Sequence, residues 1–514
     1  MTSHTTSPKN LYTAFILLIG LTLTLTFQSC KKSRSDMGKT LFKKTKNKVF
    51  KDVTPDGFAP VFQEVLEQQR SKLNNADIIT AYYQHNDYDP VLLMDHFEND
   101  DIKNVTAYYN KAGEHGLDPK LFQPAQIDTL LHRFYDKKKL KQLDEAYRDM
   151  AQLELLLANS LINYSNALQF GVINPRRIYS RYFTATARPD STFMKHVFEV
   201  TDFKSYLDSI QPKKPEYLAL QKSLTAGYTA PGLTQEETQR VLIVNLERLR
   251  WRNKPAENRY VLVNIPAYQL DIINNGSSEL NMKVCVGEGR NKDRTNTLVE
   301  YDDSDKVDRP FSRETPQLNS MINEAQVNPV WNIPESIAGK EIIVEAQKDP
   351  YYLSNKNINV YRNGKLVDDP ETIDWGGASA TEYSFKQQPG EDNALGKIKF
   401  LFPNKSSVYL HDTPAKLPFT KEMRAVSHGC VRLEKPLDFA RALFGDGSKK
   451  YTLVEKLMGQ DKSEPTDIAV SPKIPVYITY ITCWPDAAGQ IQVRPDVYGL
   501  DIVLYAHMKM IMAI

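Results

Sequence analysis

The chain has 514 residues, enough for two or three domains with a sizeable hydrophobic core. Its 65 basic and 63 acidic side chains leave a net charge of only +2, so the charge gives no reason to expect a nucleic acid as partner. The sequence contains no internal repeat of fixed period, which argues against a solenoid.

The first 30 residues have the composition of an export signal. An uncharged run of apolar residues and threonines, residues 11–27, is followed by Cys30 and then by the basic segment KKSR. A run of this length lies at the short edge for a transmembrane helix, and basic residues on its C-terminal side oppose leaving that side outside the membrane. We therefore expect a cleaved export signal and an exported protein.

Cys30 follows the small residue Ser29 and resembles the lipidated cysteine of bacterial lipoproteins, although Phe27 stands where Leu or Val is usual. The resemblance implies a lipid on Cys30 and a membrane-anchored protein in the periplasm of a Gram-negative-type bacterium. A cleaved signal without lipid and an uncleaved anchor are the alternatives.

The next segment is basic. Residues 31–51 contain nine Lys or Arg and one acidic residue, Asp36. We interpret residues 31–57 as a flexible tether, which is either a plain solvated linker or a segment attracted to anionic lipid or wall polymer.

From about residue 58 the apolar pattern is helical. Its clearest element covers residues 141–170, and Gly171 follows as a stop signal. The apolar residues of this element recur at helical spacing: Leu153, Leu156, Leu157, Leu161, Tyr164 and Leu168. A second helical stretch covers about 234–251. We predict a helical scaffold domain over residues 58–254.

Near residue 259 the pattern changes to that of short strands. Asn275-Gly276 is a strong hairpin signal between two of them. A helix with Pro at its start and Gly at its end is expected over residues 436–445. The expected strands cover residues 260–265, 269–273, 282–286, 397–402, 407–411 and 476–483. The predicted fold class is therefore α+β, with a mainly β domain over residues 255–505 after the helical domain.

Three cysteines remain after the export signal: Cys285, Cys430 and Cys483. An odd number leaves at least one thiol free, whether or not Cys285 and Cys483 pair. No CxxC motif is present, so a zinc site is poorly supported and we expect no metal or cofactor. Strand alternation places Cys285 on the face opposite its apolar neighbours, which favours a packing role over a reactive one.

Cys430 lies in the segment AVSHGCVRLEKP, residues 425–436. A nucleophilic thiol needs a base and donors for an oxyanion. His428 is two residues away and would point to the opposite face of an extended chain, so His411, which ends a predicted strand, is the better base. Gly429 permits unusual backbone angles and close substrate approach, and the N–H groups around it are candidate oxyanion donors. The alternative is an inert core thiol.

Residues 409–436 resemble the catalytic signature of the YkuD-type L,D-transpeptidases. That signature is a His, a gap of about fifteen residues, Ser/Thr-His-Gly-Cys, and an Arg or Asn two places on. Here 15 residues separate His411 from Ser427, and Arg432 takes the last place. The likeness continues in residues 82–92, 114–122, 245–251, 258–272, 328–338 and 389–404.

The resemblance extends over roughly residues 75–505 and is to the large periplasmic murein enzymes that join a scaffold domain to a catalytic domain. It implies a sandwich-like β domain with a helical lid over about 335–395. A peptidoglycan-binding module that these enzymes often carry is reduced or absent here, since only about twenty residues are available for it.

In that family the cysteine attacks a stem peptide of peptidoglycan. Carried over, Cys430 forms a thioester with a tetrapeptide stem, D-alanine leaves, and the amine of a second stem gives a 3→3 cross-link. His411 is the base or ion-pair partner, and the backbone carbonyl of Asp412 orients its ring. The carboxylate of Asp412 is expected to form a turn.

Further residues are expected around the substrate. Arg432 either binds a substrate carboxylate or forms a structural ion pair. Ser427 and His428 shape the pocket, Tyr409 lines it, and Trp331 lines it or belongs to the core. The alternatives to cross-linking are L,D-carboxypeptidase action, attachment of a protein to peptidoglycan, and a non-catalytic wall-binding lipoprotein.

Overall fold

The computed structural model describes residues 36–289, 307–308, 313–379, 381–460 and 464–512. Cys30 and the predicted export signal lie outside these residues. The chain divides into two units. The first consists of the described part of Met1–Ala112 with Pro119–Ser165 and Asp190–Gln211, and the second of Gly113–Asp118, Asn166–Pro189 and the described part of Pro212–Ile514. Among the described residues, no helix combines the length and apolar character needed to cross a membrane.

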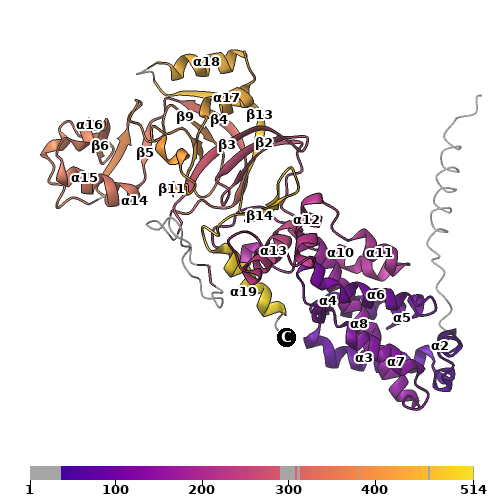
Figure 1. Cartoon of the computed structure of the whole chain (residues 1–514). Helices are drawn as coiled ribbons and strands as arrows, with labels where there is room; N and C mark the ends of the chain where they lie inside the picture. Colours follow the sequence, from indigo (N-terminus) through magenta and orange to yellow (C-terminus); the bar gives the residue numbers. More distant parts are fainter. Residues whose placement is uncertain (1–35, 290–306, 309–312, 380, 461–463, 513–514) are drawn as a thin grey trace, which may run out of the picture. The chain divides into compact units, whose positions relative to one another are not determined.

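The first unit is helical, shown in indigo to purple in Figure 1. Its elements are α2 (Met37–Thr45), η2 (Lys48–Asp52), α3 (Pro55–Gln69), η3 (Arg70–Lys72), α4 (Ala76–His85), α5 (Val91–His96), α6 (Asp101–Asn110), η5 (Pro119–Phe122), α7 (Pro124–Tyr135), most of α8 (Leu143–Phe170), α10 (Ser191–Lys195), η6 (His196–Glu199) and α11 (Phe203–Ser209). Helix α8 confirms the helix predicted over residues 141–170, and Gly171 after it has a φ of +75°.

Glu154 shows how α8 organises this unit. Its buried carboxylate accepts hydrogen bonds from the hydroxyl of Tyr83 at 2.5 Å and from the N–H groups of Leu92 and Leu93 at 3.0 and 2.7 Å. Burial raises the pKa of Glu154 to about 7, against these three donors, which lower it. One polar group of α8 therefore fixes both α4 and the first turn of α5.

The prediction of a flexible tether over residues 31–57 is wrong for residues 37–57. The side chains of Met37, Leu41 and Phe50 are buried, so α2 and η2 pack as part of the helical unit. The lysines between them remain compatible with this packing because they point outward, and Lys44 pairs with Asp100 at 2.7 Å. The basic composition hid the apolar residues that decide the fold of this segment.

The second unit contains a nine-stranded sheet. Its strands are β1 (Arg259–Asn264), β2 (Gln269–Asn274), β3 (Ser277–Gly287), β4 (Leu318–Val327), β9 (Ile398–Leu401), β10 (Leu410–His411), β11 (Ala425–Ser427), β12 (Val431–Leu433) and β13 (Thr466–Thr479). They are hydrogen-bonded in the order β11-β3-β12-β10-β9-β4-β13-β1-β2. Because β2 also pairs with β3, the order closes on itself around one hydrophobic core.

Helices accompany this sheet. They are η4 (Ala112–His115, from Gly113 on), α9 (Pro175–Ile178), α12 (Pro215–Thr225), α13 (Gln235–Arg250), η9 (Leu417–Thr420), α17 (Pro436–Phe444), α18 (Lys449–Met458) and α19 (Leu500–Met512). A two-stranded ribbon, β14 (Cys483–Pro485) with β15 (Ile491–Val493), packs Cys483 against α12 and α13. Cys285 and Cys483 are both free thiols, so they do not pair.

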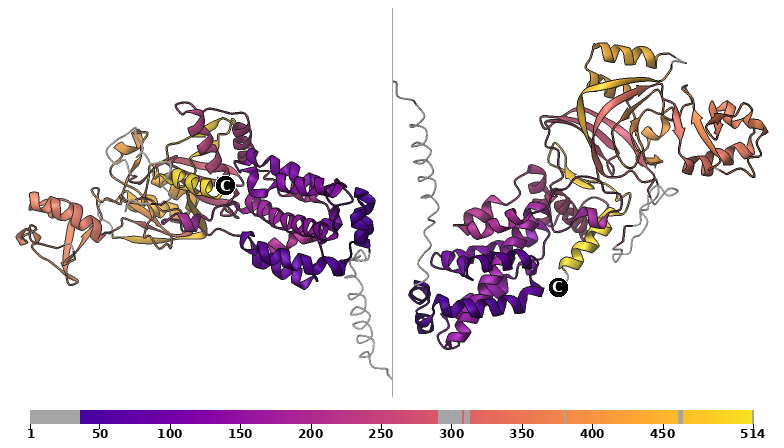
Figure 2. Two further views of the ribbon diagram at one scale, coloured as in Figure 1. Left: turned by 90° about the horizontal axis from the view of Figure 1, so that it is seen from below. Right: turned by 180° about the vertical axis from the view of Figure 1, so that it is seen from behind.

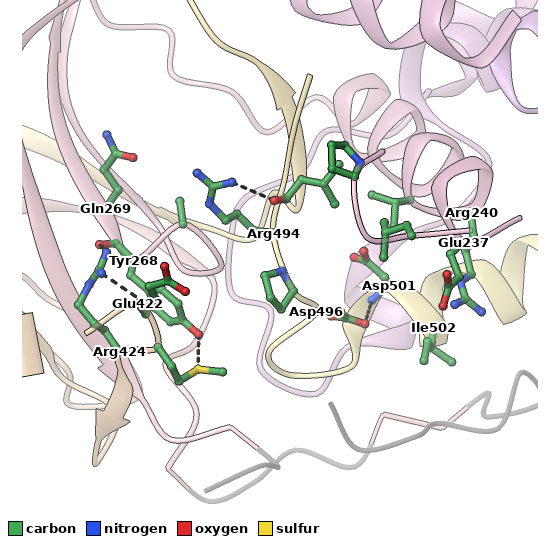
Figure 3. Close-up of a pocket in the computed structure, with 17 residues that line it drawn as sticks. Glu237, Arg240, Tyr268, Gln269, Glu422, Arg424, Arg494, Asp496, Asp501 and Ile502 are labelled. Atoms are coloured by element: carbon green, nitrogen blue, oxygen red, sulfur yellow. Dashed lines mark hydrogen bonds between the residues drawn. The ribbon is translucent and has the colours of Figure 1, made fainter. Parts of the chain in front are cut away.

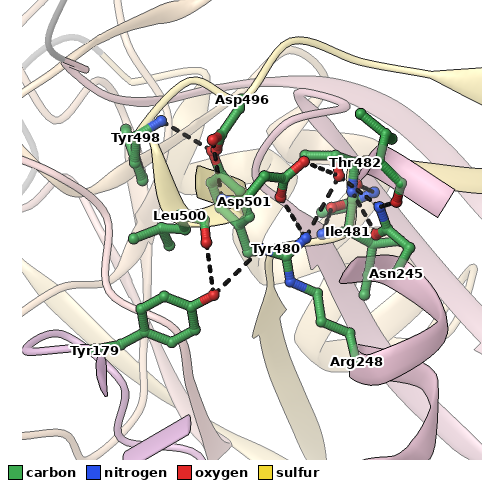
Figure 4. Close-up of polar contacts among 12 residues, drawn as sticks. Tyr179, Asn245, Arg248, Tyr480, Ile481, Thr482, Asp496, Tyr498, Leu500 and Asp501 are labelled. Carbon is green, nitrogen blue, oxygen red and sulfur yellow. Dashed lines mark hydrogen bonds and ion pairs between the residues drawn. The ribbon is translucent and has the colours of Figure 1, made fainter. Parts of the chain in front are cut away.

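A buried polar network fixes α13 to the sheet unit (Figure 4). Arg248 of α13 forms an ion pair with Asp501, and both side chains are almost fully buried. Thr482 donates to Asp501 at 2.7 Å and accepts from the amide of Asn245 at the same distance. By these contacts α13 belongs with the sheet, although the sequence had assigned residues 234–251 to the scaffold domain.

Between β4 and β9 the chain forms a lid with its own core. Its elements are β5 (Trp331–Ile333), α14 (Glu335–Ile337), η7 (Ala338–Ile342, a π-helix), α15 (Ile343–Lys348), α16 (Tyr352–Asn355), β6 (Ile358–Arg362), β7 (Lys365–Leu366), η8 (Pro370–Thr372) and β8 (Tyr383–Gln387). The expected lid helices are present, and a four-stranded sheet of order β5-β8-β6-β7 accompanies them. The lid projects from the large sheet in Figures 1 and 2.

Candidate active site

Strands β10 and β12 position the candidate catalytic residues. They run parallel, and their register pairs His411 with Arg432. Alternate residues of a strand share a face, so Tyr409 and Cys430, two positions earlier, accompany this pair. Leu410, between them, points into the hydrophobic core. The face opposite the core thus carries a thiol, an imidazole, a phenol and a guanidinium.

These side chains line a cavity of about 550 Å³ that the lid covers on one side. Eight of the residues predicted from the sequence line it: Trp331, Tyr409, His411, Ser427, His428, Gly429, Cys430 and Arg432. Side chains that the sequence did not single out also line it: Arg181, Arg313, Lys340, Glu341 and Tyr352. Trp331 also packs against the core of the lid, so it serves both of the roles expected for it.

Cys430 is partly exposed in this cavity. Burial raises the pKa of its thiol to about 11, although hydrogen bonds from the backbone and the hydroxyl of Tyr409 and the charges of Arg432 and Lys399 act to lower it. Cys430 is therefore a neutral thiol near pH 7. Cys285 is fully buried, outside the cavity, and its pKa is raised by burial to about 11 as well.

His411 is buried, and its Nδ1 hydrogen-bonds the backbone carbonyl of Asp412. Because a carbonyl only accepts, Nδ1 carries the proton and Nε2 is left as an acceptor. Burial and the charge of Arg432 lower the pKa of His411 to about 4, against the contacts to Asp412 and a backbone hydrogen bond to Leu395, which raise it. The lowered pKa favours a neutral ring, which suits a general base.

The carboxylate of Asp412 does more than form a turn. It accepts from the N–H of Lys397 at 2.9 Å and pairs with Lys416 at 2.7 Å. Gly396 lies so close to this carboxylate that a Cβ there would approach it within 2.4 Å. Asp412 therefore joins the start of β9 to the end of β10, while its carbonyl holds the imidazole.

The loop that carries Cys430 is held by hydroxyl groups. Ser427 donates to the carbonyl of Cys430 at 2.5 Å and accepts from the N–H of Gly429 at 3.1 Å, and Thr315 donates to the carbonyl of Gly429 at 2.8 Å. The N–H of Gly429 is thus already engaged and is not an oxyanion donor in this arrangement. Gly429 has a φ of +115°, a backbone conformation that explains the glycine better than lack of space does.

His428 points away from the thiol toward the lid. Its Nε2 lies 2.7 Å from a carboxylate oxygen of Glu341, which also pairs with Arg313 at 2.7 Å. Arg313 in turn pairs with Glu288 at 3.2 Å. Burial raises the pKa of Glu341, but His428 and Arg313 outweigh it, and the net shift is downward. Sequence spacing had no signal for Glu341 or Arg313, because neither lies near the His-Gly-Cys motif in the chain.

The cations Arg432 and Lys399, both near the candidate active site, have different surroundings. Arg432 forms no ion pair with any residue that the structure describes, which favours the substrate carboxylate over the structural ion pair expected as its alternative. Lys399 is paired in register with His411 on β9, and its ammonium lies 5.7 Å from the ring centroid of Tyr409. Burial lowers the pKa of Lys399. The sequence placed Lys399 on a strand but did not assign it to the site.

The described residues contain no group of three or more His, Cys, Asp or Glu side chains placed to hold a metal ion.

Comparison with known proteins gives two family matches and one relative. Residues 258–446 match the YkuD family, the L,D-transpeptidase catalytic domain, and residues 77–224 match the Scaffold domain family. A Haemophilus influenzae protein described as "Putative L,D-transpeptidase" is 29% identical over 355 residues. The match covers 68% of this chain and 66% of that relative, so the chain spans about two thirds of its length.

Proposed function

The chain belongs to the L,D-transpeptidase family in which a scaffold domain precedes a YkuD catalytic domain, and we propose that it is a peptidoglycan L,D-transpeptidase that forms 3→3 cross-links. The single observation that carries the proposal is the arrangement of two residues in one cavity. Cys430 is partly exposed there, and His411 presents Nε2 because the carbonyl of Asp412 holds Nδ1. A protein that only binds the wall needs neither group.

In the first step, the Sγ of Cys430 attacks the carbonyl of the third residue of a tetrapeptide stem. Because the resting thiol and imidazole are both neutral, the proton moves to Nε2 of His411 as the S–C bond forms. The C–N bond to D-alanine breaks, the leaving amine takes the proton from His411, and a thioester remains.

In the second step, the side-chain amine on the third residue of another stem attacks the thioester. His411 takes a proton from this amine and returns it to Sγ as the S–C bond breaks, which leaves an amide cross-link and a free thiol. Arg432 is placed to bind a carboxylate of the stem. The lid reduces access of water to the thioester, and water in place of the amine would give a shortened stem.

We further propose an exported, membrane-anchored protein of the periplasm. The support is the sequence of residues 1–30, with Cys30 after an uncharged apolar run. Peptidoglycan stems would then be met on the outer side of the cytoplasmic membrane.

The test of the activity is incubation of the full chain with purified disaccharide-tetrapeptides, followed by mass spectrometry of the products. We expect 3→3 dimers together with free D-alanine. Shortened monomers alone would identify a carboxypeptidase, and unchanged substrate would contradict the proposal.

A further inference from the structure

The second unit holds another cavity, of about 880 Å³, at the end of β11 opposite the candidate active site (Figure 3). Arg424 lies one residue before β11, and Cys430 lies three residues after it. An extended chain of six residues spans at most about 20 Å, so the cavity lies within roughly that distance of the thiol. None of the residues proposed for catalysis lines it.

Two arginines in this cavity have no carboxylate partner. Arg424 donates to the backbone carbonyls of Val284, Lys421 and Tyr268 at 3.2, 2.8 and 3.0 Å, and Arg494 donates to that of Val493 at 2.9 Å. Neither guanidinium forms an ion pair with a residue that the structure describes. Burial lowers the pKa of Arg424, while Cys285, Tyr268 and Glu434 act to raise it. The charge of Arg494 lowers it by a smaller amount, so the two cations repel one another.

Each guanidinium is held over an aromatic ring. Arg424 lies 5.3 Å from the ring centroid of Tyr268, and Arg494 lies 5.3 Å from that of Trp484. The ring of Tyr268 is itself fixed, because its hydroxyl donates to the sulfur of Met423 at 2.7 Å. Two oriented cations that are not neutralised within the fold form a site prepared for an anion.

Three of the four acidic side chains that line the cavity are engaged elsewhere. Asp501 pairs with Arg248. Asp496 accepts from the hydroxyl of Tyr480 at 2.5 Å and from the N–H of Asp501 at 2.9 Å. Glu237 accepts from the N–H of Thr234 in the cap of α13. Glu422 is exposed at the rim. The positive charge of Arg424 and Arg494 therefore remains available to a ligand.

The shape and lining favour a peptide carboxylate over a phosphate. The guanidinium fork forms two parallel hydrogen bonds with a carboxylate or a phosphate alike, so the rest of the lining decides between them. Apolar side chains also line the cavity, and they suit the alkyl parts of amino acids but offer nothing to a bare phosphate: Pro231, Leu233, Val241, Val493 and Ile502.

We propose that Arg424 and Arg494 bind the carboxylates of a second peptidoglycan stem, next to the stem that Cys430 attacks. This inference rests on the proposed function, because it takes peptidoglycan as the substrate. The site would hold a neighbouring part of the same polymer and so raise the local concentration of stems at the catalytic cavity.

The test is calorimetric titration of the full-length Cys430→Ala chain with a disaccharide-tetrapeptide. We expect two binding sites. Adding Arg494→Gln should weaken one of them on the order of tenfold to a hundredfold and leave the other unchanged. Retention of the second site in the same titration shows that the variant is folded, and Arg494→Lys should restore part of the lost affinity.

Arg441→Gln is the matched control, because Arg441 also lies over a tyrosine ring, at 5.4 Å, but is paired with Asp438 outside the cavity. It should bind like the parent. Three results would overturn the inference: a single site in the parent, no change with Arg494→Gln, or displacement of the muropeptide from this site by equimolar inorganic phosphate. If the parent shows a single site, or if Arg494→Gln changes nothing, while the wild-type chain still forms cross-links, the proposed function stands and only this inference fails.

Discussion

Glu341 of the lid and His428 of the catalytic loop are joined by a contact of 2.7 Å, although 87 residues separate them in the chain. The same carboxylate holds Arg313 at 2.7 Å, so Glu341 links the lid to the core unit on both sides of the cavity. Its place in a π-helix, a rare form that often marks functional sites, supports a positioning role. His428 thus contacts the lid and is directed away from the thiol.

Glu341→Gln should loosen the lid. The amide keeps an acceptor for His428 but loses the charge that attracts Arg313, so water should reach the thioester more often. We expect the ratio of shortened stems to cross-linked stems to rise about fivefold, as for the loss of about 1 kcal/mol. Glu345→Gln, which removes an exposed lid carboxylate paired with Lys348, is the control and should leave the ratio unchanged.

The contact of Glu341 should also depend on pH. The pKa of the Glu341 carboxyl is lowered in the fold. The charged contacts of Glu341 therefore stabilise the fold above the ordinary pKa of a glutamic acid, and this stabilisation is lost as the pH falls through the lowered pKa. The product ratio of the parent should therefore approach that of Glu341→Gln only below about pH 4.5. If the parent and Glu341→Gln already gave the same ratio between pH 8 and 6, this assignment would be contradicted.

Cys430→Ala should abolish both cross-linking and D-alanine release, because no other exposed thiol lies in the cavity among the described residues. Cys285→Ala is the matched control, since this thiol is buried in the neighbouring strand. A carbapenem, which resembles the donor stem, should add once to the intact mass of the parent and not at all to Cys430→Ala. Two additions, or one that persists without Cys430, would remove the nucleophile assignment.

Burial of neutral His411 should make the fold sensitive to acid. Its pKa is about 4 in the fold and about 6.5 in an unfolded chain, so between these values only the unfolded chain binds the proton. Stability is therefore highest above pH 6.5 and falls as the pH drops toward 4, by up to about 3 kcal/mol. His411→Gln should flatten this slope in urea unfolding at pH 5 and pH 7, and an unchanged slope would contradict it.

Gly429→Ala should damage activity more than folding. The nearest atom to an added Cβ is 3.5 Å away, so space is sufficient, but a φ of +115° strains any other residue by about 1–2 kcal/mol. The loop would relax and displace the thiol. We expect a clear loss in kcat/KM with a melting temperature only slightly lowered. Gly113→Ala, at a position with open space and ordinary φ, should change neither.

Labelling with radioactive palmitate should mark the parent protein and not Cys30→Ala, if Cys30 is the lipidated residue. The expected lipid is attached through the thiol of Cys30, and alanine has no thiol. Equal labelling of both proteins would rule out Cys30 as the site of the lipid.

The sequence alone determined those features that depend on local periodicity and on short spacing. The period of two in a strand was enough to prefer His411 over His428 as the base for Cys430, and the helical spacing of leucines was enough to predict α8. The change of period near residue 259 marked the beginning of the strands, although the unit that contains them also includes α12 and α13. These periodicities depend on residues that are close together in the chain, so they can be recognised from a single sequence.

Only the tertiary structure decided which distant groups meet. Glu341 comes to the site with the lid, and it meets Arg313, which precedes β4, there. Carboxylate partners of Arg424 and Arg494 could be excluded only once the neighbouring carboxylates were placed. The segment from Met37 to Phe50 has a basic composition, yet its few apolar residues bury and order it. Burial and ion pairing depend on the whole packed chain, which is why composition and spacing predicted neither.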